Sequence, residues 1–145
     1  MNRSKRLRSE FVQFIPEELD DGVLYISRRY KTASHLCCCG CGLEVVTPLN
    51  SAKWSLSEYP GGEVSLSPSI GNWSFPCLSH YWIDRNEIRW AGVMSAAQIA
   101  AVKAGDRRDA ELHARQRIGR FAKFRQKVSK AWSLSLSTFR RWWGG

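Results

Sequence analysis

The sequence predicts a small, mainly β domain followed by a helical, basic C-terminal extension, so that the chain is α+β overall. Three observations support this fold class. Residues 11–90 alternate short runs of β-branched and aromatic side chains with Pro and Gly, which is typical of short strands joined by turns. The helical spacing of apolar residues begins only after residue 90. All five cysteines lie in two short segments of the β-like region, where they predict a feature that ties loops together.

Several segments have the composition of strands, and we expect seven to nine short strands in all. The segments are 11–15, 23–27, 43–47, 53–57, 63–67, 80–83 and 87–90. The clearest hairpin joins 53–57 to 63–67, because both alternate in polarity and Tyr59-Pro60-Gly61-Gly62 separates them. Residues 68–73 contain Pro, Gly and Asn and are expected to form a loop.

Helix signals begin at Ser95, which has Gln98 three residues later, the spacing of a capping box. Gly105 is expected to end this helix, and a second helix is expected from 106 or 107 to about 132. The expected organisation has four parts. They are a basic N-terminal arm (1–10), a β domain (11–94), a helical extension (95–132) and a basic Trp/Arg tail (133–145) that is expected to be poorly ordered.

The net charge of +9 is concentrated at the two ends of the chain. Residues 1–8 carry +4, residues 9–106 carry −4 and residues 107–145 carry +9. A nucleic acid or an acidic partner would therefore bind through residues 107–145 rather than through the β domain. No run is long enough for a membrane span and no apolar segment follows the basic N-terminus, so we expect a soluble, cytoplasmic protein.

The cysteines predict a metal site. Cys37, Cys38, Cys39 and Cys41 lie within five positions, and Cys77 precedes His80 by three residues. Thiolates and imidazoles are ligands that Zn²⁺ prefers. Disulfides are disfavoured because the cysteines are odd in number, the basic N-terminus is not expected to act as a signal peptide, and near neighbours would close strained rings. A redox pair and buried free thiols are weaker alternatives.

The candidate ligands outnumber the four positions of a tetrahedral ion. Cys77 and His80 are the strongest candidates, followed by Cys39 and Cys41, and then by Cys37. His35 is a further candidate ligand, or it orients a ligand or carries a proton. Gly40 can adopt the backbone angles that turn neighbouring thiols toward one ion, and so can Gly42.

These motifs resemble an uncharacterised-domain family of small bacterial zinc proteins encoded beside ubiquitin-like conjugation genes. The residues that carry the resemblance are Leu24-Tyr25 with Ser27, His35 to Gly42, Trp54 with Leu56, Pro68 to Asn72, Cys77 to Ile83, and Trp90. The family position of Cys38 varies, which implies that Cys38 is not a ligand. Where Leu78 stands, the family often has arginine. The resemblance implies a zinc protein of a ubiquitin-like pathway that trims a ubiquitin-like precursor or removes it from targets, with that protein and its conjugation enzymes as partners.

Two kinds of zinc site fit these residues. A zinc ion with three protein ligands and a water could hydrolyse a peptide bond, with His35, Glu44 or Asp84 carrying the proton. Ser69 and Asn72 could then donate hydrogen bonds to the oxyanion, although their simpler role is turn formation. A zinc ion with four Cys/His ligands would instead be structural. The leading expectation is therefore a zinc metallopeptidase acting on a ubiquitin-like protein. The alternative is a non-catalytic zinc scaffold or binding module of the same pathway.

Overall fold

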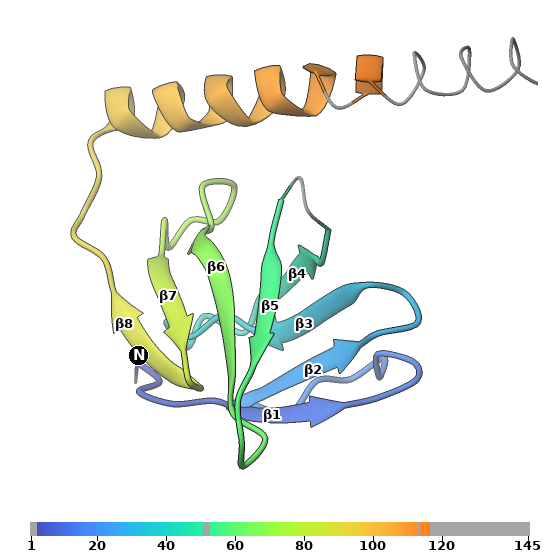
Figure 1. The fold of residues 1–145 in the computed structure, drawn as a ribbon. Helices are drawn as coiled ribbons and strands as arrows, with labels where there is room; N and C mark the ends of the chain where they lie inside the picture. Colours follow the sequence, from blue (N-terminus) through green and yellow to red (C-terminus); the bar gives the residue numbers. More distant parts are fainter. Residues whose placement is uncertain (1–2, 51–52, 113, 117–145) are drawn as a thin grey trace, which may run out of the picture. The chain divides into compact units, whose positions relative to one another are not determined.

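The mainly β fold class is confirmed. The computed structural model describes residues 3–50, 53–112 and 114–116. In this part of the chain, eight strands form two four-stranded sheets, and residues 96–112 and 114–116 are helical (Figure 1). The chain divides into one compact unit that ends at Ile99 and a second that begins at Ala100. The candidate site lies wholly in the first unit.

The first sheet has the order β1-β2-β3-β4. Its strands are β1 (Arg8–Phe11), β2 (Val23–Ser27), β3 (Thr32–Leu36) and β4 (Glu44–Pro48). β1 pairs in parallel with β2, and the other pairs are antiparallel. The strand expected at 11–15 was placed too late, because β1 ends at Phe11. The strand β3 was not expected, because its sequence Thr-Ala-Ser-His-Leu contains little of the β-branched and aromatic composition used to find strands.

The second sheet is an antiparallel meander in the order β5-β6-β7-β8. Its strands are β5 (Ser55–Glu58), β6 (Val64–Gly71), β7 (His80–Asp84) and β8 (Glu87–Trp90). The β5–β6 hairpin is confirmed. The loop expected at residues 68–73 was partly wrong, because β6 continues through Pro68 to Gly71 after a register shift between Leu66 and Ile70. This continuation brings Ser69 onto a strand beside β7.

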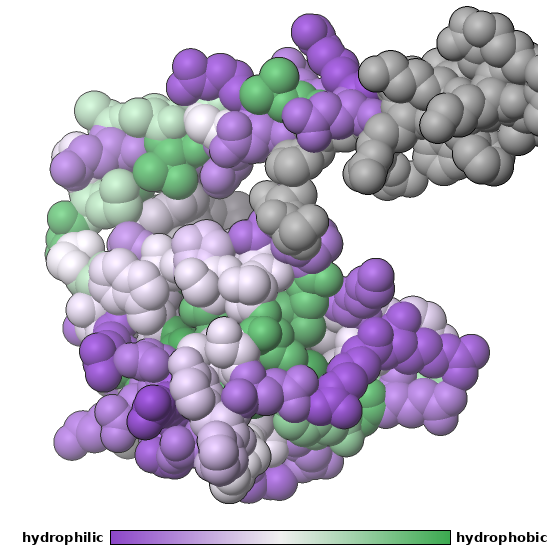
Figure 2. All heavy atoms as spheres, viewed as in Figure 1, coloured by the Kyte–Doolittle hydropathy of each residue, from purple (hydrophilic) through white to green (hydrophobic). Residues whose placement is uncertain are grey.

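One hydrophobic core lies between the two sheets. Leu24 and Ile26 of the first sheet belong to the same buried cluster as Val64, Tyr81 and Ile83 of the second. Successive side chains of a strand point to opposite faces. Because Tyr81 and Ile83 face the core, the side chains of alternate residues on β7 face outward. The outer surface over β6 and β7 has mostly pale colours in Figure 2, which correspond to intermediate hydropathy.

The basic segment at the start of the chain is packed against the β domain. Leu7 is buried, and its amide donates to the carbonyl of Asn86 at 2.8 Å. The carbonyl of Lys5 accepts a hydrogen bond from Ile88, and the guanidinium of Arg3 lies 4.7 Å from the ring centroid of Trp90. The described part of the expected arm therefore contributes to the fold, and its last residues enter β1.

The capping box at the start of the helix is confirmed. The amide of Ser95 donates to Oε1 of Gln98 at 2.8 Å, and the amide of Gln98 donates to Oγ of Ser95 at 3.3 Å. Gly105 does not end the helix, which continues to residue 112. A glycine inside a helix costs only about 1 kcal/mol relative to alanine, and the alanine-rich surroundings tolerate it.

The expected end of the helical extension and the tail at 133–145 lie outside the described residues, as does most of the basic stretch 107–145. Among the helical residues that the structure describes, none forms a segment long and apolar enough to cross a membrane.

Candidate functional site

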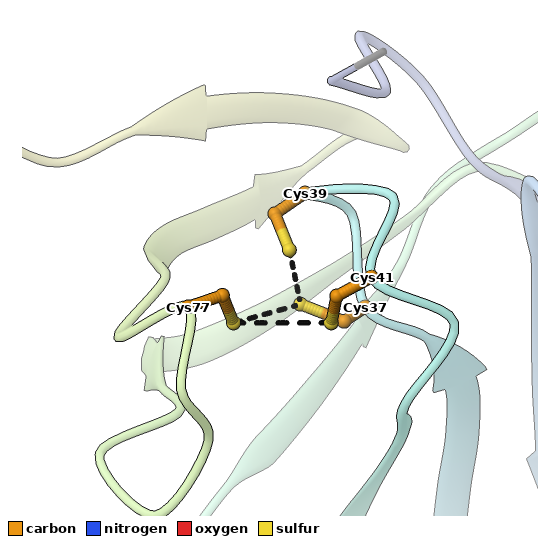
Figure 3. Close-up of side chains that lie close together, drawn as sticks. All are labelled: Cys37, Cys39, Cys41 and Cys77. Carbon is orange, nitrogen blue, oxygen red and sulfur yellow. Dashed lines mark hydrogen bonds between the residues drawn. The ribbon is translucent and has the colours of Figure 1, made fainter. Parts of the chain in front are cut away.

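Four cysteines from two distant segments meet in one cluster (Figure 3). Their Sγ atoms all lie within 4.8 Å of one another. We call this group the cysteine cluster, and it consists of Cys37, Cys39, Cys41 and Cys77. The first three lie on the turn between β3 and β4, and the fourth lies on the loop between β6 and β7.

The local sequence explains how the β3–β4 turn presents three thiols. The amide of Cys37 donates to the carbonyl of Leu43 at 2.8 Å, which closes the turn at its base. The amide of Gly40 donates to the carbonyl of Cys37 at 2.9 Å. Gly40 and Gly42 have φ angles of 81° and 76°, in the left-handed region that glycine adopts without strain. These angles fold the turn tightly enough to bring alternate side chains to one point.

The cysteine cluster fits a tetrahedral metal ion. Cys37 Sγ lies 3.4 Å from Cys39 Sγ and 3.9 Å from Cys77 Sγ, and the sulfurs of Cys41 and Cys77 are also 3.9 Å apart. A zinc ion with Zn–S bonds of about 2.3 Å separates its four sulfurs by about 3.8 Å. The four cysteines can therefore hold a metal ion at the spacing that zinc requires.

Burial and hydrogen bonds act differently on the thiols of the cluster. Burial raises the pKa of Cys37 and of Cys39. Burial also raises the pKa of Cys77, but hydrogen bonds from the side chain and backbone of Ser79 outweigh it and lower the pKa to about 7. A bound divalent cation would favour the thiolate form of all four.

Cys38 does not belong to the cluster. Its side chain is buried in the core, and burial raises its pKa to about 12, so that it stays a neutral thiol. Its position next to Cys37 on the turn sends its side chain into the core instead of toward the other sulfurs. This placement agrees with the expectation that Cys38 is not a ligand.

Buried polar groups lie directly behind the cluster. Ser79 Oγ is 3.1 Å from Cys37 Sγ, and Nδ2 of Asn72 donates to Ser79 Oγ at 2.8 Å and to Cys37 Sγ at 3.6 Å. Asn72 is 7% exposed, so its amide supports the sulfur ligands from inside. Ser69 and Asn72 were both expected to donate hydrogen bonds to one oxyanion. In the structure the Asn72 amide instead contacts Ser79 and Cys37, and the Ser69 hydroxyl contacts His80.

His35 lies in the core rather than at the surface. It is fully buried, and its Nε2 forms a hydrogen bond of 2.8 Å with the hydroxyl of Tyr81. Nδ1 of His35 is buried without a hydrogen-bond partner among the described residues. Burial lowers the pKa of His35 to about 4. A neutral imidazole without exposed surface has no access to a substrate, which leaves His35 an internal packing and hydrogen-bonding group.

His80 lies outside the cysteine cluster and pairs with a serine. Its Nε2 is 2.9 Å from Oγ of Ser69, across the junction of β6 and β7. Gly71 pairs with His80 in the sheet, and the amide of Asn72 donates to the carbonyl of Ser79 at 2.9 Å. Burial lowers the pKa of His80, which favours the neutral imidazole. From the sequence, Ser69 was expected to donate to an oxyanion and His80 to bind a metal ion, and no pairing of the two residues was expected.

A serine hydroxyl within hydrogen-bond reach of a neutral imidazole is the arrangement that activates a serine nucleophile. Sequence spacing alone did not reveal it, because the two residues are eleven positions apart on strands whose register includes a shift. A useful signal was present: Ser69 and His80 both stand next to a residue with strong strand character, Ile70 and Tyr81. Correct pairing of these two core residues places Ser69 diagonally opposite His80.

The fold and the site define a small two-sheet β domain that combines a candidate four-cysteine metal centre with a candidate serine–histidine pair. Residues 11–91, more than half of the chain, match the family described as bacterial ubiquitination-like system serine protease (BubE), and the chain belongs to this family. No curated protein and no solved structure gives a significant match. The family description agrees with the expected peptidase of a ubiquitin-like system, and it names a serine protease where the sequence analysis expected a zinc metallopeptidase.

Proposed function

We propose that this domain is a serine peptidase of a bacterial ubiquitin-like system, with Ser69 as its nucleophile and His80 as its general base. The observation that carries the proposal is the 2.9 Å hydrogen bond between Ser69 Oγ and His80 Nε2. The membership of the chain in a family of serine proteases supports the same reaction class.

The reaction follows from these two groups. The hydroxyl of Ser69 donates its proton to His80 Nε2 while Oγ attacks the scissile carbonyl carbon. The imidazolium then gives that proton to the departing amine, and an ester to Ser69 remains. A water molecule, deprotonated by the same imidazole, attacks the ester and releases the carboxylic acid and the free serine. This sequence requires a neutral imidazole at the start, which the burial of His80 favours.

We assign the cysteine cluster a structural zinc ion. Four thiolates fill a tetrahedral coordination shell and leave no position for an activated water. Zinc would contribute folding free energy by joining the β3–β4 turn to the β6–β7 loop, two segments of a small domain. Of the candidate ligands predicted from the sequence, this proposal keeps the four cysteines, because His80 is hydrogen-bonded to Ser69.

The metal centre and the serine–histidine pair share one loop. Residues 72–79 connect the end of β6, which carries Ser69, to the start of β7, which begins at His80. Cys77 lies on this loop, and Ser79 contacts Cys37. A metal ion held by Cys77 would therefore fix the loop and with it the separation between nucleophile and base. Removal of the metal is expected to reduce activity although the metal takes no part in the chemical steps.

The experiment that tests the proposal is labelling with a fluorophosphonate probe, followed by mass spectrometry of the modified peptide. The zinc-loaded protein should be labelled at Ser69, and Ser69→Ala and His80→Gln should each abolish labelling while one metal ion per chain is retained. Ser67→Ala is the matched control, because Ser67 lies on the same strand with an exposed side chain that is not paired with a histidine. Full labelling of Ser69→Ala would disprove the assignment of the nucleophile.

Activity on the pathway's substrate needs a separate assay. The protein is incubated with the precursor of a ubiquitin-like protein from a bacterial ubiquitination-like system, with and without a chelator. Cleavage that Ser69→Ala abolishes supports a processing peptidase. Cleavage that survives in Ser69→Ala but not in the chelated protein would favour the zinc metallopeptidase of the sequence analysis. No cleavage together with tight binding of the precursor would favour a binding module.

A further inference from the structure

Two tryptophans lie against the imidazole of His80. The ring centroid of Trp73 is 5.0 Å from that of His80, at an interplanar angle of 63°. The ring centroid of Trp82 is 5.4 Å away, at an angle of 36°. Both separations fall in the range of favourable aromatic contacts. The two indoles come from different places, since Trp73 lies on the β6–β7 loop and Trp82 on β7 itself.

Trp73 occupies its position because residue 71 is glycine. An added Cβ at Gly71 would lie 2.4 Å from the indole ring of Trp73, closer than real Cβ contacts allow. The indole therefore rests directly on the backbone of β6 at Gly71, which is the residue that pairs with His80 across the strands. The backbone of Gly71 is not in the left-handed region, so alanine is compatible with its φ angle. Glycine is therefore required at residue 71 because the indole of Trp73 lies too close for a side chain, and not because of the backbone conformation.

Among the described residues, none supplies the imidazole of His80 with the hydrogen bond that usually orients a catalytic histidine. In serine proteases a carboxylate accepts a hydrogen bond from Nδ1 and thereby fixes the tautomer and the orientation of the ring. Nδ1 of His80 is buried and has no hydrogen-bond partner among the described residues. The hydrogen bond to Ser69 restrains the ring at Nε2 only, and packing must supply the restraint on the Nδ1 side.

We propose that Trp73 and Trp82 are positioning residues that hold the imidazole of His80 toward Ser69 by ring packing, in the place of an orienting carboxylate. This inference rests on the proposed role of His80 as general base. Trp73, seated on Gly71, restrains the ring from the loop, and Trp82 restrains it from the neighbouring outward position on β7. The indoles act through His80 and do not take part in proton transfer.

The first test compares Trp73→Ala and Trp82→Ala with the wild type in the zinc-loaded full chain. The rate constant for fluorophosphonate labelling of Ser69 is measured, because the small probe does not depend on contacts with an extended substrate. A displacement of a catalytic group by about 1 Å costs up to about 100-fold, so we expect each variant to label about 10- to 100-fold more slowly. Trp73→Phe and Trp82→Phe keep an aromatic ring and should recover most of the rate. Hydrolysis of a small activated ester should show the loss in kcat with little change in KM.

The second test uses a double-mutant cycle between residues 71 and 73. Gly71→Ala alone should slow labelling, because its Cβ displaces the indole of Trp73. In the Trp73→Ala background the same change should have almost no effect, since the displaced ring is already absent. Equal effects of Gly71→Ala in the two backgrounds would show that Gly71 acts independently of Trp73 and would overturn this part of the inference.

Nuclear magnetic resonance provides a readout that is independent of activity. In the wild type, the ¹⁵N shifts of the His80 imidazole should show one dominant tautomer with the proton on Nδ1, because Nε2 accepts from Ser69. In Trp73→Ala and Trp82→Ala the shifts should move toward the average of the two tautomers. A metal content of one ion per chain shows that the cysteine cluster is intact. A Trp73→Ala protein that fails this check is replaced by Gly71→Ala, which displaces the same indole, and a Trp82→Ala protein that fails it is replaced by Trp82→Leu, which lacks an aromatic ring.

The outcomes separate this inference from the proposed function. If the wild type is not labelled at Ser69, the proposed function fails. If the wild type is labelled and the folded tryptophan variants react at the same rate with an unchanged tautomer signal, only the positioning role fails. Slower labelling with a shifted tautomer average supports both.

Discussion

The buried hydroxyl of Tyr81 is the most informative single group to remove from the core. Tyr81 is fully buried, and its hydroxyl bonds Nε2 of His35 at 2.8 Å and accepts a longer hydrogen bond of 3.5 Å from Asn72. Tyr81→Phe would leave His35 with no hydrogen-bond partner at either ring nitrogen among the described residues. A buried polar group left without a partner costs about 1–3 kcal/mol. For a domain of this size, a loss of about 2 kcal/mol lowers Tm by about 8–16 °C.

Tyr25→Phe is the matched control for this change. The hydroxyl of Tyr25 donates to Oδ2 of Asp20 at 2.8 Å, but Asp20 is exposed and its carboxylate can be rehydrated. We therefore expect a loss of only about 0.5–1 kcal/mol. The measurement is the free energy of unfolding by denaturant, with zinc at a fixed excess over protein.

A third variant tests whether the loss of stability comes from the unpaired imidazole of His35. Replacing both partners of a buried hydrogen bond with apolar groups is less costly than removing one. His35→Leu in the Tyr81→Phe background should therefore recover part of the lost stability. Labelling of Ser69 should be unchanged in folded Tyr81→Phe, because residue 81 faces the core and His80 faces outward. The reasoning is refuted if Tyr81→Phe is no more destabilising than Tyr25→Phe, or if the double variant is less stable than Tyr81→Phe alone.

Three further predictions concern the site and the helix. The proposed general base, His80, must be neutral to act, and burial lowers its pKa below the ordinary value of 6.5. The value of kcat/KM should therefore be constant at neutral pH and should fall only below pH 6.5. An inflection above pH 6.5 would contradict this. Cys77→Ser should lower zinc affinity at least tenfold and slow labelling of Ser69, whereas Cys38→Ala should keep one zinc ion per chain, as measured by elemental analysis. Ser95→Ala should cost about 1 kcal/mol of helix stability, seen as faster hydrogen exchange at the amide of Gln98; unchanged exchange would show that the capping hydrogen bond contributes little.

Sequence patterns located the elements whose side chains alternate clearly. The β5–β6 hairpin and the strands β2, β7 and β8 follow from runs of apolar and β-branched residues between turn residues. The segment that became β3 lacked this pattern and was missed, because its strand conformation depends on pairing with β2 and β4 on both sides. The turn residues around Pro68 were a misleading local signal, since strand pairing with β7 extends β6 past them.

The chemistry of the site was predictable in part. Cysteine spacing predicted the meeting of two distant loops, because few groups other than a metal ion bring thiols together in this way. The same spacing suggested His80 as a ligand, since Cys77 and His80 are three residues apart. A turn could have directed both side chains to one ion, but β7 begins at His80 and its register with Gly71 turns the imidazole outward to Ser69. Side-chain direction at the end of a strand depends on this register, which the spacing of residues along the chain does not contain.

The loop of residues 72–79 gives the domain a consequence for its behaviour in a stressed cell. It connects the strand that carries Ser69, the proposed nucleophile, to His80, the proposed base, and it carries one of the four sulfurs of the cysteine cluster. Oxidants attack zinc-bound thiolates readily and release the ion. If the cluster holds zinc as proposed, oxidation of its thiolates would lower the proposed peptidase activity without modifying Ser69 or His80, and reduction followed by metal binding would restore it.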